Sequence, residues 1–465
     1  MSAPAGRVEP VVSAQFGRLQ HGGVLLGLHP AQLVLVATGL VVAVTGVYTA
    51  GPTGLAVGAP VWLTLLVAGL GSVRGRPVVA WVPLLATWSV RRLTGATTAV
   101  TSVRDRTPAR LVLPGLGRLE VQPCPALKAV LVVDRAAGTW TAVLALEPAG
   151  FVLASPIEQV QAVQGWDRVL GGLCRQPGVA RAQLLVRSRS GGLAPARAWW
   201  RQHTTTGPAA VLADLLDTAF TDSVRREHLL AVALRPPRAR NRALRVEASG
   251  QQLTGVTDAL SAAGLQPGAW LDAPALAAVV AAGYDPSVQA ARLEDVAPTG
   301  VAETWSALRT EGAVHATFWV AEWPRAAVHA AFLQPLLLGE EPGRSWSLIV
   351  EPIPTGRALR DIRRAKAEHA ADAVQRQRWG QIEDASVTAE VADLAQREAE
   401  LVAGHGDLRF TGLLTLTAPT EEVLAARCAA AQTAAAASMC ELRRLVGQQG
   451  LAHAAAALPL ARGVL

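Results

Sequence analysis

The most restrictive feature of this sequence is the stretch from Leu19 to Val73, which contains no Asp, Glu, Lys or Arg. Prolines and glycines at positions 51–60 divide it into two apolar halves, residues 31–50 and 55–73. At ~1.5 Å rise per residue, each half spans ~28–30 Å as a helix, close to the hydrocarbon thickness of a bilayer. Neither half shows a polar stripe of helical period. The stretch therefore predicts a two-helix transmembrane hairpin, in preference to buried core helices or a signal peptide.

Arginine placement predicts the orientation of this hairpin. The connection between the halves is uncharged, whereas arginines flank the stretch on both sides: Arg7, Arg18, Arg74, Arg76, Arg91 and Arg92. Because positive flanks stay in the cytoplasm, both termini are expected there, and the chain is expected to be a multi-pass protein of the cell (inner or plasma) membrane. Residues 1–100 hold six Arg and one Glu, out of a formal net charge of +7 for the chain. Most of the excess positive charge is thus explained by membrane topology.

A second apolar segment, RGRPVVAWVPLLATWSVRRLTG, follows the charge-free stretch. Trp81 and Trp88 lie in it between arginines, which favours a helix in the membrane interface with tryptophan at headgroup level. The alternative is a cytoplasmic core helix, and Pro83 weakens a regular helix at this point.

The remainder of the chain has the pattern of a cytoplasmic α+β body. Strands are predicted in ARLVLPGLGRLEV, in the hairpin AVLVVDRAAGTWTAVLAL, and in AQLLVRSRS, HATFWVAEW, SWSLIVEPI and DLRFTGLLTLTAP. A helix is predicted after Ser155, with Pro156 at its first position and Glu158 completing a capping box. Residues 195–310 are expected to be mainly helical, a long helix is expected from Thr355 to about Val402, and another after Thr420.

These patterns divide the chain into six parts. We expect a cytoplasmic tail (1–30), the hairpin (31–75), an interfacial helix and linker (76–106), a first α+β subdomain (107–235), a helical middle (236–310) and a second α/β subdomain (311–465).

Several classes of activity find no support in the sequence. A Walker A loop needs Gly-Lys-Ser/Thr, but the two lysines, Lys128 and Lys366, follow Leu and Ala, so a P-loop ATPase or GTPase is excluded. Cys124, Cys174, Cys428 and Cys440 form no CxxC pair, and they are expected to be reduced and mostly buried. No HExxH, GxSxG or EF-hand pattern occurs. We expect no catalytic residue, cofactor or metal, and a protein that is not an enzyme.

Two arginine clusters could bind partners. Arg235, Arg238, Arg240, Arg242 and Arg245 could contact the phosphates of DNA or lipid, although a solvated loop leading into a helix is the favoured interpretation. Arg357, Arg360 and Arg364 lie on one face of the long helix, where a salt-bridged solvated face is the default and partner docking the sharper alternative.

Three other motifs have simpler interpretations. His405 lies in the sequence Gly404-His405-Gly406-Asp407, which is expected to be a helix-to-strand turn rather than an acid–base site. Trp199-Trp200 and Trp319/Trp323 are expected to be core or domain-interface residues.

Segments from nearly the whole chain resemble an actinobacterial family of integral membrane proteins associated with conjugation-type, type IV-like secretion. The matching segments are QFGRLQHGGVLLGL, GRPVVAWVPLLATWSVRRLTG, SPIEQVQAVQGWDRVLGGLC, FWVAEWPR, EPIPTGRALRDIRRAKAEHAADA, ELVAGHGDLRFTGLLTLTAP and CELRRLVGQQGLAHAAAALPLARGV. The N-terminal hairpin is similar to PrgI-type membrane subunits. The body looks like the N-terminal, non-catalytic domain of conjugative secretion ATPases, without the motor that follows in those proteins.

The resemblance implies a non-enzymatic, membrane-anchored assembly component that docks a separate motor ATPase. Its expected partners are the lipid bilayer and other subunits of a hetero-oligomeric secretion complex. Two alternatives remain open: a membrane subunit of a type VII-like secretion complex, and a membrane-tethered nucleic-acid-binding protein that uses the arginines at 235–245.

Overall fold

The computed structural model describes residues 13–14, 30–73, 76–100, 110–147, 150–176, 178–190, 224–288, 290–339, 341–378 and 385–463. The chain divides into two compact units. Arg18–Thr98 form the first, here called the N-terminal unit, and Met1–Gly17 with Ala99–Leu465 form the second, here called the body.

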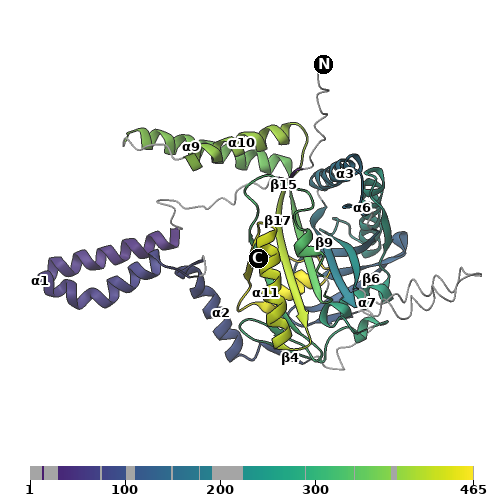
Figure 1. Ribbon diagram of the computed structural model, residues 1–465, viewed down its shortest axis with the longest axis horizontal. Coiled ribbons are helices and arrows are strands. Elements are labelled where there is room, and N and C mark those ends of the chain that lie inside the picture. Colours follow the sequence, from purple (N-terminus) through teal and green to yellow (C-terminus); the bar gives the residue numbers. More distant parts are fainter. Residues whose placement is uncertain are drawn as a thin grey trace, which may run out of the picture. The chain divides into compact units, whose positions relative to one another are not determined.

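The N-terminal unit is built on one long apolar helical segment, α1 (Pro30–Leu70). Among the described residues, α1 is the helix that is long and apolar enough to cross a membrane, with a mean hydropathy of 2.1. Its backbone leaves helical geometry at Ala50 and Gly51, where φ is −141° and 60°. Near the two ends of α1, Gln32 Nε2 donates to the carbonyl oxygen of Gly69 at 2.8 Å, so these ends lie beside each other (Figure 1).

The boundaries of the apolar segment differ from those expected. Helical structure resumes directly after Gly51 and includes Pro52, because a proline is tolerated in a first helical turn, where its missing N–H has no partner. The segment ends at Leu70 rather than residue 73. Strands β2 (Ser72–Val73) and β3 (Arg76–Pro77) then pair with each other.

The expected helix near Trp81 is present as α2 (Trp81–Leu93), after the single turn η1 (Val78–Ala80). Pro83 is its third residue and lies in the first turn, so it does not interrupt the helix. Within the N-terminal unit, α2 runs at an angle to α1 (Figure 1).

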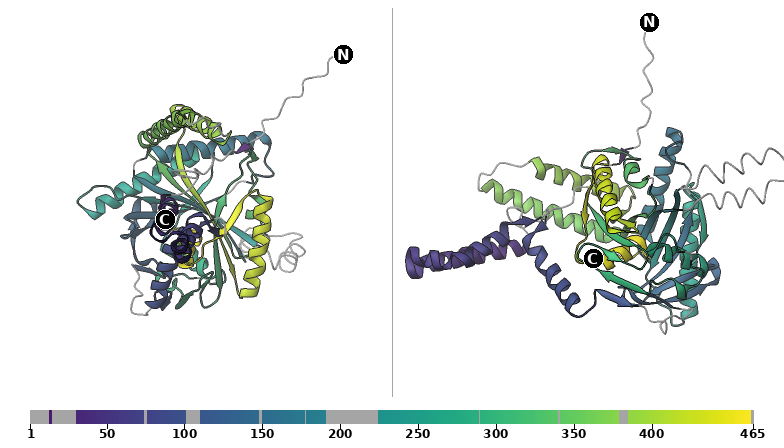
Figure 2. Two further views of the ribbon diagram at one scale, coloured as in Figure 1. Left: turned by 90° about the vertical axis from the view of Figure 1, so that its left-hand side faces the viewer. Right: turned by 60° about the horizontal axis from the view of Figure 1, so that its bottom comes forward.

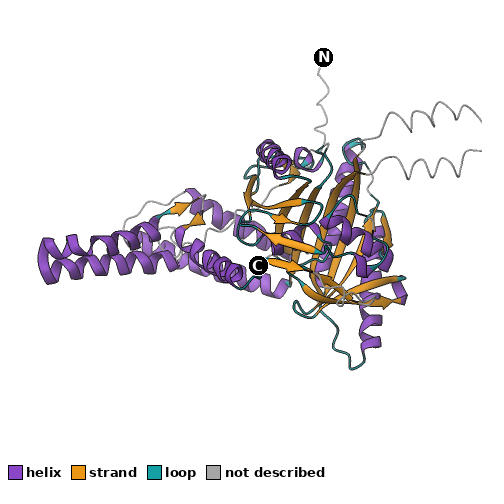
Figure 3. Cartoon of the chain, turned by 90° about the horizontal axis from the view of Figure 1, so that it is seen from below, coloured by secondary structure: helices purple, strands orange, loops and turns teal. Residues whose placement is uncertain are grey.

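The body contains a 14-stranded sheet in which every pairing described is antiparallel. The strands, drawn in orange in Figure 3, follow the path β4-β12-β13-β14-β17-β16-β9-β10-β8-β7-β6-β5, with β11 on β8 and β18 on β14. In the first part of the body they are β4 (Thr98–Val100), β5 (Arg110–Leu113), β6 (Gly117–Cys124), β7 (Ala129–Asp134), β8 (Thr139–Leu146), β9 (Val179–Ser190), β10 (Val224–Leu234) and β11 (Pro267–Trp270). In the second part they are β12 (Gly300–Glu303), β13 (Leu308–Arg309), β14 (Val314–Glu322), β16 (Arg344–Ile353), β17 (Asp407–Ala418) and β18 (Glu441–Arg444).

A separate two-stranded ladder joins the first segment of the body, before the N-terminal unit, to its later part. Strand β1 (Ser13–Ala14) pairs with β15 (Val328–His329), with Ser13 opposite His329 and Ala14 opposite Val328.

The sheet consists of two halves with the same connectivity. The order β8, β9, β10, α6 (Arg242–Ala262), β11, α7 (Ala273–Tyr284) recurs as β14, β16, β17, α11 (Glu421–Ala437), β18, α12 (Gln449–Ala457). The pairing recurs as well, since β9-β10-β8-β11 in one half corresponds to β16-β17-β14-β18 in the other. The antiparallel pair β9–β16 joins the halves. The body is thus a repeat with an approximate twofold relation at its centre.

Helices cover both faces of this sheet. Neighbouring residues of a strand point to opposite faces. Val143 packs in the same apolar cluster as α7, whereas Leu144 packs with α3 (Pro156–Arg175) and α6. In the second half, Trp319 packs with α12 and Phe318 with α11. The face with α3, α6 and α11 is continuous, because Trp346 and Val350 of β16 point to the same side and join the clusters of α11 and α6. Helices α7 and α12 lie on the opposite face.

Two further helices, α9 (Thr355–Arg378) and α10 (Ala385–Val402), connect β16 to β17. They pack against each other and project from the end of the sheet (Figures 1 and 2). Buried Ala358, Ile362 and Leu401 form the contact, and Lys366 makes an ion pair with Glu398 across it. The remaining helical pieces are α8 (Gln334–Leu337), η3 (Pro125–Leu127) and η4 (Leu293–Asp295).

The structure corrects two expectations for the body. Val224–Leu234 is a strand, although residues 195–310 were expected to be mainly helical. One long helix was expected from Thr355, whereas the structure has two helices, α9 and α10, that pack against each other. In addition, the regions expected as two subdomains (107–235 and 311–465) contribute strands to one sheet. Trp199-Trp200 and most of the tail at 1–30 lie outside the described residues.

Candidate functional site

The apolar segment α1 directs its side chains outward. Tyr48 is 92% exposed, Val57 82% and Val44 66%, and eight other large apolar side chains of α1 are also exposed. Such an uninterrupted apolar exterior is unfavourable in water and suits a hydrocarbon environment. The segment is therefore the candidate membrane site of the chain.

The two halves of α1 approach each other closely at glycines. A Cβ atom on Gly54 would lie 2.1 Å from the carbonyl oxygen of Gly46, and one on Gly69 would lie 2.7 Å from Val36 Cγ2. Midway along the halves, a Cβ on Gly39 would lie 3.2 Å from Leu65 Cβ. Small residues at close helix contacts are typical of packing inside membranes.

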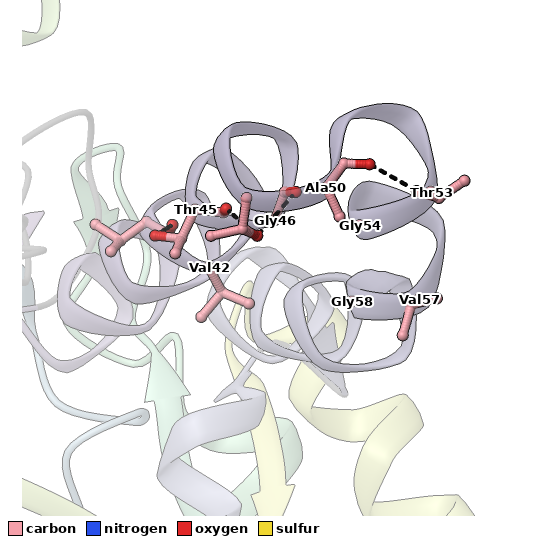
Figure 4. Close-up of a pocket in the computed structure, with 10 residues that line it drawn as sticks. Val42, Thr45, Gly46, Ala50, Thr53, Gly54, Val57 and Gly58 are labelled. Atoms are coloured by element: carbon pink, nitrogen blue, oxygen red, sulfur yellow. Dashed lines mark hydrogen bonds between the residues drawn. The ribbon is translucent and has the colours of Figure 1, made fainter.

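A shallow groove of about 540 Å³ lies on α1 near its backbone break (Figure 4). Its lining includes three threonines whose hydroxyl groups all donate to carbonyl oxygens of α1 itself: Thr45 to Val41, Thr49 to Thr45 and Thr53 to Ala50. The groove therefore presents mainly methyl groups and glycine backbone, which suits hydrocarbon rather than a polar ligand.

The arginines of α9 are exposed but take part in local contacts. Arg357 Nε lies 3.9 Å from Asp361 Oδ2, and Arg364 Nε donates to Glu368 Oε1 at 3.0 Å. Arg360 Nε donates to the carbonyl oxygen of Gly356 at 3.0 Å. The three residues thus lie together on a solvated face of α9, where each contacts a neighbouring group of the same helix.

The arginines at 235–245 lie in a loop and the first turn of α6. Asn241 caps this helix by accepting from the Ala243 N–H. Arg242 Nη2 donates to Glu120 Oε2 at 2.8 Å, and Arg245 Nε donates to the carbonyl oxygen of Ala239 at 2.6 Å. Arg235, Arg238 and Arg240 are exposed. Two of the five arginines therefore form hydrogen bonds within the fold. The segment is a loop that leads into a helix.

The motif around His405 is a turn. Gly404, with φ 97°, lies in the turn after α10 ends at Val402, and the His405 N–H donates to the carbonyl oxygen of Glu400. His405 Nδ1 lies 3.3 Å from Asp167 Oδ2, and both side chains are exposed. Asp407 binds Arg397 instead, with oxygen–nitrogen distances of 2.6 and 3.1 Å. The described residues around His405 therefore form no catalytic arrangement.

Sequence reasoning missed a buried polar layer between the sheet and α12. Its members are Gln183 and Arg187 of β9, His315 and Thr317 of β14, Ser347 of β16, Thr415 and Thr417 of β17, and Gln449 and His453 of α12. Gln183 Nε2 donates to Ser347 Oγ at 2.8 Å and to the carbonyl oxygen of Ala455 at 3.0 Å. Gln449 Oε1 accepts from the Thr317 N–H at 2.9 Å. These bonds fix α12 on the centre of the sheet.

Arg187 is the largest side chain of this layer and is 1% exposed. It donates to the carbonyl oxygens of Val279 in α7, at 2.7 Å, and of Ala457 at the end of α12. Glu227 Oε2 lies 3.5 Å from Nη1. Burial lowers the pKa of Arg187 to about 10, and Glu227 opposes this shift, so the guanidinium stays charged at neutral pH.

Two buried histidines lie next to each other in the same layer, with ring centroids 4.4 Å apart. His315 Nδ1 bonds with Thr417 Oγ1 at 2.9 Å, whereas neither ring nitrogen of His453 makes a hydrogen bond of ordinary geometry within the described residues. Burial lowers the pKa of His315 to about 4. Burial, then His315 and Arg187, hold the pKa of His453 well below its ordinary value. Both rings are neutral at physiological pH.

The other candidate residues have structural roles. All four cysteines are free and buried, and burial raises the pKa of each thiol, to about 11 for Cys440. Trp323 packs edge-on against Trp346 and Phe410. In the described part of the chain, no group of three His, Cys, Asp or Glu could hold a metal ion.

No protein-family model matches this chain, and no curated protein matches it either.

Proposed function

We propose that this chain is a non-enzymatic, membrane-anchored component of a type IV-like, conjugation-type secretion apparatus, in which its body docks a separate motor ATPase. The carrying observation is α1, whose apolar side chains face outward over 41 residues in a chain whose body has an ordinary buried core. The sequence resemblance supplies the secretion context.

We further propose that α1 crosses the bilayer twice as a hairpin. The break at Ala50–Gly51 and the Gln32–Gly69 hydrogen bond support this topology. The pairing of β1 with β15 supports it independently. Ser13–Ala14 precede α1 and Val328–His329 follow it, so both lie on the same side of the membrane when paired. This pairing favours an even number of crossings between them.

The docking face proposed for the ATPase is the exposed side of α9 that carries Arg357, Arg360 and Arg364. Residues 101–465 hold 37 basic and 35 acidic residues, so a general polyanion partner is not favoured. The three arginines are exposed on a helical pair that projects from the sheet, which suits contact with an acidic protein surface (Figure 2).

Reporter fusions test the topology. A reporter at Thr53 should appear outside the cell membrane, while reporters at Ala5 and Leu465 should appear inside. Detection of Ala5 and Leu465 on opposite sides would show a single crossing and contradict the hairpin.

Charge reversal tests the docking face. The R357E/R360E/R364E variant should co-purify less of the partner ATPase, with an association rate about tenfold lower at low salt, because charged rim contacts mainly set the rate and its salt dependence. Membrane insertion should be unchanged. Arg292→Glu with Arg325→Glu, two exposed arginines elsewhere in the body, is the matched control. Equal recovery of the ATPase by the triple variant and the control would place the docking face elsewhere.

A type VII-like membrane subunit has the same anchor-and-body plan, and the identity of the co-purified ATPase separates it from the type IV-like proposal. The nucleic-acid alternative is weaker, because Arg242 and Arg245 are bonded within the fold. A salt-dependent DNA-binding measurement tests it.

A further inference from the structure

Helix α2 presents an uncovered apolar face. With about 100° between successive residues of a helix, Val82, Leu85, Ser89 and Leu93 share one side. Val82 is 62% exposed and Leu93 87% exposed. Trp81 and Trp88 border this side, about 40° and 60° around the helix from Leu85, and Trp81, Leu84 and Trp88 are half-buried. The exposed side of α2 therefore consists mainly of aliphatic residues, and the two half-buried tryptophans lie at its edge.

The N-terminal unit is also one-sided in charge. Residues 18–98 contain five arginines, Arg18, Arg74, Arg76, Arg91 and Arg92, and no Asp or Glu. Arg91 and Arg92 lie in the last turn of α2, and Arg92 is exposed beside the apolar face. A cationic helix end next to an aliphatic face matches an anionic surface with an apolar interior.

The connection to α1 restricts where α2 can be. Only the short segment 71–80 separates Leu70 from Trp81. Within this segment β2 pairs with β3, and the Val78 N–H donates to the carbonyl oxygen of Gly71 at 3.0 Å. If α1 lies in the bilayer, α2 begins within a few residues of its surface.

We propose that α2 binds anionic lipid headgroups, with Val82, Leu85 and Leu93 in the acyl-chain boundary and Arg91 and Arg92 at the phosphates. This inference rests on the proposed membrane insertion of α1. It adds a second contact with the membrane, and the headgroup charge controls the strength of that contact.

Two hydroxyl-bearing residues provide a matched pair of probes. Ser89 lies on the apolar face, and Thr87 lies about 160° away around the helix; both are exposed. Because the native cysteines are buried, S89C and T87C can be labelled selectively with a nitroxide in the full chain. The unsubstituted chain controls for background labelling.

The labelled full-length proteins are reconstituted in phosphatidylcholine vesicles with or without phosphatidylglycerol. In anionic vesicles the S89C probe should collide with dissolved oxygen more than with a water-soluble nickel chelate, and the T87C probe should show the reverse. Omitting phosphatidylglycerol, or substituting R91Q/R92Q, should shift the equilibrium of α2 toward the water-exposed state by about 30-fold, because each arginine near an anionic surface contributes about fivefold.

Two results would overturn the proposal. One is an S89C probe as exposed to the nickel chelate as T87C in anionic vesicles. The other is equal protection of S89C in neutral and anionic vesicles and in R91Q/R92Q, which would show apolar contact without headgroup recognition. Alkaline extraction of the same vesicles reports on α1 separately: loss of the whole chain would refute the anchor itself, whereas retention with an exposed S89C probe refutes only the role of α2.

Discussion

At the scale of single residues, the buried histidines are the groups most sensitive to solution conditions. Neither His315 nor His453 is exposed to solvent, and both are neutral in the folded protein because burial depresses their pKa values. In the unfolded chain a histidine has a pKa of about 6.5. As the pH falls below this value, the unfolded state takes up protons that the folded state does not, so the free energy of unfolding decreases.

We expect this loss to begin near pH 6.5 and to continue to about pH 4, where His315 becomes protonated in the folded state. His315 alone contributes about 3 kcal/mol over this window. The H453F variant should be as stable as the parent protein at pH 7.5, or more stable, because it removes ring nitrogens that lack bonds of ordinary geometry. It should also lose less stability at pH 5. Thermal unfolding of the full chain in detergent at the two pH values measures both effects.

H405F makes the same chemical change at an exposed position and serves as the comparison variant. If H453F and the parent protein lose the same stability between pH 7.5 and pH 5, His453 does not contribute to the sensitivity to acid.

The buried polar layer shows why residue-level prediction failed in the body. Gln183, Thr317 and Thr415 occupy inward positions of their strands, where an alternating pattern leads one to expect apolar side chains. Their partners lie far away along the chain, as in the hydrogen bond from Gln183 Nε2 to the carbonyl oxygen of Ala455 in α12. No local pattern indicates such pairs.

At the scale of elements, the close glycine contacts of α1 lead to a packing prediction. In G54A the new Cβ would overlap the Gly46 carbonyl group and approach Ala50 Cβ to 2.9 Å, so the two halves must separate near the break. We expect G54A to destabilise the protein by about 1–3 kcal/mol in mixed detergent micelles titrated with sodium dodecyl sulfate.

Gly58 is the matched control, because a Cβ there would have Trp62 Cδ1 as its nearest neighbour, at 3.7 Å. G58A should be neutral or gain up to about 1 kcal/mol through the higher helix propensity of alanine. Equal effects of the two substitutions would show that the halves are not in close contact at Gly54.

Elements with strong local signals were predictable. The capping box of α3 forms as expected, with the Ser155 N–H donating to Glu158 Oε2 at 2.8 Å, and the β7–β8 hairpin turns between Asp134 and Thr139. Strand β10 was missed because its first half consists largely of charged and polar residues, Arg225, Arg226, Glu227 and His228. These residues interrupt the alternation of apolar and polar side chains that indicates a strand. The separation of α9 from α10 was missed because amphipathic patterns continue on both sides of residues 379–384.

At the scale of the whole molecule, the sequence predicted two α/β regions but not their union. The β9–β16 ladder joins strands that are distant in the chain, with Leu184 opposite Leu348, and it merges both regions into one sheet. The two halves are equivalent in the order of their strands. Local residue patterns do not indicate such an equivalence. The apolar N-terminal segment was predictable because the absence of charge is itself a local signal.

The β1–β15 ladder also has a consequence for the order of events during biosynthesis. Ser13–Ala14 are made first, and their partners Val328–His329 are made only after every strand from β2 to β14. At about 5–20 residues per second, the ribosome needs roughly 15–60 s to reach them. During this interval the N-terminal tail has no body to pair with, while α1 has already left the ribosome. If α1 inserts into a membrane as proposed, it can do so before the ladder closes, and the ladder then closes only when Ser13–Ala14 lie on the side where the body folds.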